Sequence, residues 1–257
     1  MTNTSRRLYA CLSVVGIALL LGGCGGNAPY SPIIADASSD LVLTLENPTV
    51  TVEQGASAVF KMNLRAVGSF SAPATVVVHT LPLQWSLTPG NVVTPTTSGT
   101  PLSLTVPTGG VAVGDYEFTV SATGGGLTRA VALTLRVTGV SIGIAPESRT
   151  LLPGGTAEYT VTVTPLNGHT LSASLEISGL PSNVESSFNP DTVTFSGSSP
   201  RTSQLVLSLP DDGGSHPVNR GSAGQTFTVT ARSGAGSVYA TAVVIIDDRG
   251  GIDAIIR

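Results

Sequence analysis

Residues 154–165 read GGTAEYTVTVTP, and this short stretch decides the fold class. After the Gly-Gly pair, every second residue from Ala157 to Val163 is apolar, and the residues between them are polar. A period of two places one face of a β-strand on a core and leaves the other face in solvent. Tyr, Val and Thr also favour strands over helices. The stretch therefore predicts a half-buried β-strand that begins after a tight turn.

The same alternation recurs along most of the chain, and clusters of Gly, Pro, Asn and Ser separate one run from the next. Many short alternating runs divided by turn residues are typical of an all-β fold. The runs before residue 140 are Leu41/Leu43/Leu45, Phe60/Met62/Leu64, Leu102/Leu104/Val106, Tyr116/Phe118/Val120 and Val131/Leu133/Leu135/Val137. Those after it are Ile142/Ile144, Tyr159/Val161/Val163, Leu175/Ile177, Val193/Phe195, Leu205/Leu207/Leu209, Phe227/Val229 and Val238 to Ile246.

An internal repeat divides these runs into two copies. GASAVFKMNL, which begins at Gly55, matches GGTAEYTVTV from Gly154, and FTVSA at 118–122 matches FTVTA at 227–231. The offset grows from 99 to 109 between these matches, so we expect about ten additional residues in the second copy, within 210–224. A period near 100 residues suits a whole sandwich domain rather than a solenoid unit.

The repeat predicts two tandem domains, at residues 40–138 and 139–248. The link between them, RVTGVSI at 136–142, has only a few residues. We therefore expect the two domains to stack end to end.

The second copy resembles bacterial extracellular Ig-like modules. The resemblance rests on the Pro-Gly-Gly turn at 153–155, the strand that follows it, the segment GLPSNVESSFNP at 179–190 and the closing FTVTA. It covers about 140–246 well and 40–138 more loosely, because HTLPLQWSLTP at 79–89 replaces the GLP segment. The resemblance implies two immunoglobulin-like β-sandwiches that serve as spacers or binding modules. By itself it implies no activity.

The N-terminus predicts export. Arg6 and Arg7 precede an apolar run at 8–21 that contains one serine, which is typical of a secretory signal peptide. The run is shorter than the roughly 20 residues that a membrane-spanning helix needs. We therefore expect residues 1–23 to be a cleaved signal peptide, with an uncleaved membrane anchor as the alternative.

Residues 21–24, LGGC, resemble the bacterial lipobox. The resemblance implies cleavage between Gly23 and Cys24 and acylation of Cys24 with palmitate-type chains, of which two or more suffice for stable membrane anchoring. No Asp follows Cys24, which resembles cargo of the outer membrane where the host is Gram-negative. We predict an exported, lipid-anchored cell-envelope protein, with residues 24–39 as acylated cysteine and flexible tether.

The composition of the chain argues against one class of partner and against a disulfide. Removal of residues 1–23 from the 257-residue chain leaves 234 residues, and the loss of two arginines moves the formal net charge from −4 to about −6. A mildly acidic chain argues against nucleic-acid binding, which needs a basic patch. The remaining cysteine, Cys11, lies in the predicted signal peptide, so the mature chain has no thiol for a disulfide.

No motif predicts catalysis. The three histidines, His79, His169 and His216, lack a local signature, and no G-x-S-x-G motif is present. His79 is interpreted as a strand-end surface residue and His169 as a turn residue. We predict no enzyme, because an enzyme would require acidic residues and histidines from both domains to meet in one cleft.

One acidic loop is a candidate cation site. Asp211 and Asp212 in DDGGSH at 211–216 could offer oxygen ligands to Ca²⁺, together with Asp247 and Asp248 if the loop folds toward them. A solvated loop is the simpler interpretation. No other cofactor is expected.

Trp85 and the C-terminal tail each have two interpretations. Trp85 aligns with Val184 in the second copy, which favours a core role over a sugar-stacking platform. The tail at 249–257 could pair with a sheet edge, although a frayed terminus is the simpler interpretation.

The function that these features predict is a non-enzymatic surface spacer or protein-interaction module. A carbohydrate-binding or adhesin module and an accessory subunit of an envelope complex are the alternatives. The partners expected are the membrane, through the lipid, and an unidentified envelope protein or glycan.

Overall fold

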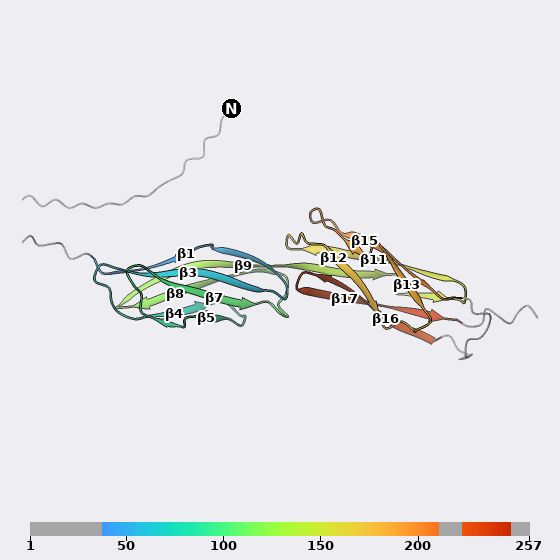
Figure 1. The fold of residues 1–257 in the computed structure, drawn as a ribbon, viewed down its shortest axis with the longest axis horizontal. Helices are drawn as coiled ribbons and strands as arrows, with labels where there is room; N and C mark the ends of the chain where they lie inside the picture. The colour runs from blue at the N-terminus through green and yellow to red at the C-terminus, as the bar shows by residue number, and fades with distance from the viewer. Residues whose placement is uncertain (1–37, 211–222, 248–257) are drawn as a thin grey trace, which may run out of the picture. The chain divides into compact units, whose positions relative to one another are not determined.

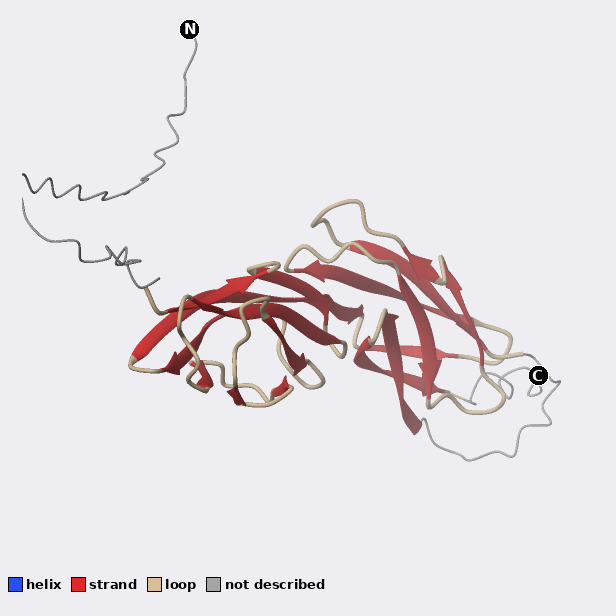
Figure 2. Cartoon of the chain, turned by 60° about the vertical axis from the view of Figure 1, so that its left-hand side comes forward, coloured by secondary structure: helices blue, strands red, loops and turns tan. Residues whose placement is uncertain are grey.

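The computed structural model describes residues 38–210 and 223–247, and in these residues it contains strands and loops and no helix (Figure 2). That part of the chain accordingly holds no helix long and apolar enough to cross a membrane. The all-β prediction is confirmed. The predicted signal peptide, Cys24 and most of the tether lie outside the described residues.

The first group of strands forms a two-sheet sandwich (Figure 1). One sheet has the order β1-β3-β7-β5, and the facing sheet has β2 and β8 on either side of β9, then β4 and β6. This is the strand order of an immunoglobulin-like sandwich. The strands are β1 (Asp40–Leu45), β2 (Thr49–Glu53), β3 (Ser57–Val67), β4 (Ala74–His79), β5 (Ser86–Thr88), β6 (Val92–Val93), β7 (Thr100–Pro107), β8 (Gly114–Gly124) and β9 (Leu127–Ala145).

The second group repeats the arrangement. Its sheets have the orders β9-β11-β15-β13 and β10-β17-β16-β12-β14. The strands are β10 (Ser148–Leu151), β11 (Thr156–Leu166), β12 (Ala173–Ser178), β13 (Glu185–Asn189), β14 (Thr192–Val193), β15 (Arg201–Ser208), β16 (Ala223–Ser233) and β17 (Gly236–Ile246). The interval between β15 and β16 is longer than that between β7 and β8, where the repeat comparison places the additional residues.

Strand β9 belongs to both sandwiches. Its first half pairs with β8 and β2, and its second half, from Gly139 onward, pairs with β11 (Figure 1). The residues expected to form a short link are therefore part of a ladder of backbone hydrogen bonds. No loop separates the two sandwiches at this point, and the expected boundary between Thr138 and Gly139 falls inside the strand.

Each sandwich encloses its own apolar core, built from the alternating residues of facing sheets. An edge-to-face aromatic pair lies in each core. Phe60 and Phe118 have ring centroids 5.3 Å apart in the first, and Tyr159 and Phe227 are 5.1 Å apart in the second. Such pairs add about 0.5–1.5 kcal/mol beyond the burial of their area. Trp85 packs against the first core and is partly buried.

We expect Phe227→Ala to lower the free energy of unfolding by about 3–5 kcal/mol, because it removes a fully buried ring and its partner contact with Tyr159. The measurement is urea denaturation of the full chain, followed by near-ultraviolet circular dichroism. Thr226→Ala, at the exposed neighbouring position of the same strand, is the matched control and should change the midpoint little. Equal losses in both variants would contradict the assignment of Phe227 to the core.

Candidate functional site

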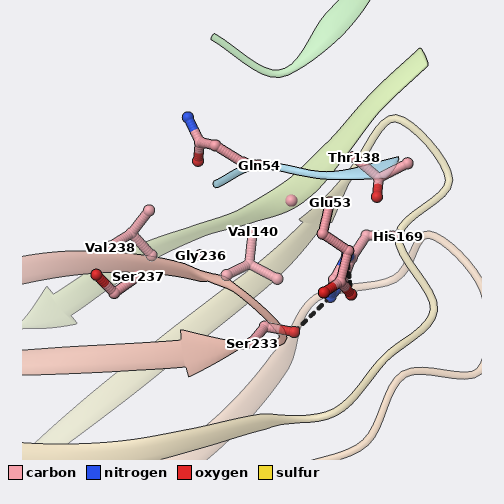
Figure 3. A pocket seen from close by; sticks show the side chains of 10 residues that line it. Glu53, Gln54, Thr138, Val140, His169, Ser233, Gly236, Ser237 and Val238 are labelled. Atoms are coloured by element: carbon pink, nitrogen blue, oxygen red, sulfur yellow. Dashed lines mark hydrogen bonds and ion pairs between the residues drawn. The ribbon is translucent and has the colours of Figure 1, made fainter. Parts of the chain in front are cut away.

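Three polar side chains from distant parts of the sequence meet beside β9 (Figure 3). Glu53 lies at the end of β2, His169 follows β11 and Ser233 ends β16. We call these three residues the polar junction. Glu53 comes from the first sandwich, and the other two come from the second. The junction is the place in the described chain where an acidic residue and a histidine from the two sandwiches come together.

The turn between β2 and β3 fixes the position of Glu53. Buried Thr108 donates its hydroxyl hydrogen to the carbonyl oxygens of Glu53 and Ala56, at 3.1 and 2.7 Å. The backbone N–H of Gln54 donates to the carbonyl of Thr138 on β9, and its side-chain amide donates to the carbonyl of Val111. These bonds attach the turn to the end of the first sandwich.

A second turn positions His169. Asn167 has a positive φ of 52° and Gly168 one of 79°, the left-handed pair that an Asn-Gly turn adopts readily. The amide of Asn167 donates to the carbonyl of Val137 on β9 at 3.0 Å and to the carboxylate of Asp115 at 2.8 Å. The turn of the second sandwich is thus bonded to strands of the first.

Asp115 is held by charge as well. Arg136 donates two hydrogen bonds to its carboxylate, at 3.0 and 2.8 Å. These bonds, with the smaller contribution of Asn167, lower the pKa of Asp115 from 3.8 to about 2. Because Asp115 is paired, it stays a carboxylate at any pH at which an imidazole titrates.

Glycine is required where the β2–β3 turn meets the hairpin turn between β16 and β17. A Cβ on Gly234, whose φ is 53°, would lie 1.3 Å from a carboxylate oxygen of Glu53. A Cβ on Gly55, whose φ is 93°, would lie 2.6 Å from the carbonyl oxygen of Ala235. The absence of side chains at these two positions lets the turns approach each other.

The polar junction has the order of groups found in a hydrolase triad. His169 Nε2 lies 2.7 Å from Ser233 Oγ, and His169 Nδ1 lies 3.9 Å from Glu53 Oε1 (Figure 3). The side chain of His169 is 1% exposed and that of Glu53 is 20% exposed. A serine, a histidine and a carboxylate in this sequence of contacts can in principle activate the serine as a nucleophile.

Two observations argue against nucleophilic chemistry here. Ser233 donates its hydroxyl hydrogen to the carbonyl of Ser172 at 2.9 Å, so His169 Nε2 must be the donor toward Ser233 Oγ. In that arrangement the imidazole cannot accept the serine proton. The adjoining cavity is also about 10 Å³, which is room for one water molecule and for no acyl substrate.

Most of the other predicted site residues lie beyond the part of the chain that the structure describes. Gly23, Cys24, Asp211, Asp212, Asp248 and His216 lie outside the described residues. Asp247 follows β17, and its backbone N–H donates to the carbonyl of Leu151. Within the described ranges, no group of three or more His, Cys, Asp or Glu side chains is placed to hold a metal ion.

Two exposed residues outside the polar junction, His79 and Tyr239, could contact a ligand. His79 is exposed at the end of β4, as predicted, and its Nε2 lies 2.7 Å from Ser121 Oγ. Tyr239 on β17 is 74% exposed and pairs in register with Thr230, which pairs in turn with Glu176. The alternating run at 238–246 did not predict that Tyr239 would be so exposed.

Sequence reasoning also missed the junction, although the repeat held a signal. At the offset of 99, His169 corresponds to Phe70, which is buried in the first core. His169 is likewise buried and makes an edge contact with Phe195, with ring centroids 5.8 Å apart. A histidine at a core position of the repeat predicts a buried imidazole, which the interpretation of His169 as a turn residue did not include.

No protein-family model and no curated protein matches the chain. Solved structures with a similar fold include the D00-D0 domain of intimin, 18% identical, with a TM-score of 0.41 over 81% of this chain and 100% of that one. Domains 4 and 5 of the S-layer protein SbsC are 16% identical, with a TM-score of 0.29 over 83% and 100%. Titin domains z1z2 in complex with telethonin are 17% identical, with a TM-score of 0.28 over 83% and 98%. The Ig-like assignment rests on the strand order of this chain.

We expect Gly234→Ala to destabilise the full chain more than Gly126→Ala. Both glycines have positive φ, at 53° and 77°, but a Cβ at Gly126 meets nothing within 4 Å, whereas one at Gly234 overlaps the Glu53 carboxylate. The loss of stability in Gly126→Ala, about 1 kcal/mol, measures what a side chain costs at a positive φ. The additional loss in Gly234→Ala measures the clash with Glu53. Thermal unfolding of both variants checks this, and equal losses would show that the turns do not meet.

Proposed function

We propose that the protein is a non-enzymatic, lipid-anchored component of the cell envelope, in which two coupled Ig-like sandwiches act as a surface spacer and present an interaction face. The observation that supports this best is the continuity of β9. A strand that belongs to both sandwiches, reinforced by bonds from Asn167, resists free movement of one sandwich against the other. Such coupling suits a spacer better than a pair of modules on a flexible linker.

The anchor and the location are part of the same proposal. They rest on the signal-peptide pattern at 1–23 and on the lipobox-like LGGC at 21–24. The acylated Cys24 would tie the chain to the membrane, in the outer membrane of a Gram-negative host, and residues 25–39 would connect the lipid to β1.

Carbohydrate binding is the second candidate, and Tyr239 supports it. An exposed tyrosine on the sheet, with Thr230 and Glu176 beside it in register, offers a ring for stacking and polar groups for hydroxyls. The hydrogen-bonded pair of Arg232 and Glu176 adds charge to the same sheet. The accessory-subunit hypothesis stays open as a form of the interaction proposal.

We expect the wild-type protein to partition with the membrane fraction and Cys24→Ser to become soluble, because the substitution removes the acceptor of the lipid. In-cell crosslinking and mass spectrometry of both fractions measure location and partners in one experiment. One dominant envelope protein captured by the wild type would support the interaction proposal. Membrane-bound protein that captures no partner would favour a passive spacer or a glycan target through Tyr239. Cys24→Ser that stays on the membrane would overturn the anchor.

The polar junction provides a direct test of the enzyme alternative. We expect Ser233 to remain unlabelled by a fluorophosphonate probe, since its hydroxyl hydrogen is donated to Ser172 and the cavity has no room for the probe. Intact mass of the folded chain measures labelling, and a serine hydrolase run alongside establishes that the probe is active. Covalent modification of Ser233 in the folded protein, absent from Ser233→Ala, would replace the spacer proposal with a hydrolase.

A further inference from the structure

The polar junction contains an unsatisfied acceptor. Glu53 Oε1 is buried and has no hydrogen-bond partner among the described residues. One candidate partner is His169 Nδ1, at 3.9 Å, which is beyond the length of about 2.7–2.9 Å of a charge-assisted hydrogen bond. A buried carboxylate oxygen without a partner loses the hydrogen bonds that water would give it. The polar junction therefore contains one carboxylate oxygen whose hydrogen bond is not made.

The hydrogen bonds of Ser233 determine which imidazole nitrogen carries the proton. Ser233 donates to Ser172 and so accepts from His169 Nε2, which must bear a hydrogen. A neutral His169 then has a bare Nδ1, whose lone pair faces the Glu53 carboxylate. Two acceptors face each other, and no hydrogen bond can form between them. In the neutral state, therefore, no direct hydrogen bond joins the two sandwiches at this pair.

One proton on Nδ1 of His169 allows a hydrogen bond to Glu53. When a proton from solvent binds at Nδ1, the imidazolium has a donor at each nitrogen, and the net charge of the Glu53–His169 pair changes from −1 to 0. A movement of about 1 Å then brings Nδ1–H within hydrogen-bond distance of Oε1.

No other titratable group faces this pair among the residues that line the cavity, which are otherwise Gln54, Thr138, Gly139, Val140, Ser233, Gly236, Ser237 and Val238. Nearby charges on the packed strands already have partners. Arg136 on β9 binds Asp115 on β8, and Arg232 on β16 binds Glu176 on β12. The proton response of the junction therefore belongs to Glu53 and His169.

We propose that Glu53 and His169 form a proton-dependent latch between the two sandwiches, closed when the imidazole is protonated and released when it is neutral. The latch does not depend on the lipid anchor or on any partner. Strand β9 stays continuous in both states, so release loosens the contact between the turns and leaves the chain connection intact. The sandwiches are accordingly more rigidly coupled at acidic pH than at mildly alkaline pH.

Pulsed electron paramagnetic resonance on the full chain tests the latch. Spin labels at Val92→Cys on β6 and Tyr239→Cys on β17, both exposed positions, report the distance between the sandwiches once Cys11 and Cys24 are replaced by serine. We expect a narrow distance distribution at about pH 5 and a broader one at about pH 8, the range in which imidazole changes its charge. The same narrow or broad distribution at both pH values would overturn the proposal.

Glu53→Gln is the decisive variant. Its amide can donate to a bare Nδ1 and its oxygen can accept from a protonated one, so the junction closes in both protonation states. We expect a narrow distribution at both pH values in Glu53→Gln. A pH response that survives this substitution would overturn the latch, because another group would then be responsible.

The double variant His79→Gln/His216→Gln is the matched control. It removes the other two imidazoles of the chain, so the pH response that remains comes from His169. We expect it to respond as the wild type does. Loss of the response in this control would assign it to His79 or His216 and contradict the proposal. The wild-type titration stands by itself should a variant fail to fold.

Discussion

The shared ladder of β9 is the constraint on which the rest of the structure depends. The N–H and C=O groups of one strand are hydrogen-bonded first to β8 and β2 and then to β11, so the backbone leaves no unpaired interval where a linker would lie. Paired backbone of this kind cannot bend freely without losing hydrogen bonds. The turns at Glu53, Asn167 and Gly234 therefore meet beside the strand, and their polar contacts follow from that approach.

Much of the fold could be predicted from local pattern, because alternation reports directly which residues face a core. Phe60, Tyr159 and Phe227 were all expected to be buried, and they are. The continuity of β9 was not predicted. Gly139 and the short polar residues around it have the composition of a turn, and only the pairing of Ile142 and Ile144 with β11 keeps the backbone extended. Tertiary pairing overrides local preference at this point.

The polar junction could not be predicted by local reasoning, because Glu53, His169 and Ser233 are far apart in the sequence. Comparison of the two copies would have narrowed the search. His169 stands where the first copy has buried Phe70, and Glu53 stands where the second has exposed Leu152. Only His169 therefore stands at a position that is part of the core in the other copy, and it is the residue that the comparison of copies could have singled out.

Strand β9 contributes side chains to both cores, so the number of residues between the two sets is constrained. Leu133, Leu135 and Val137 enter the first core, whereas Val140 enters the second and Ile142 and Ile144 pack against it. The first three have odd numbers and the others even, so the strand serves the two cores from opposite faces, and four consecutive buried residues at 137–140 mark the change. One residue inserted in this interval would move the core-facing side chains on one side of the insertion to the solvent face of the strand. Two inserted residues would return them to the core face. The connection between the sandwiches can therefore be lengthened or shortened only in even steps.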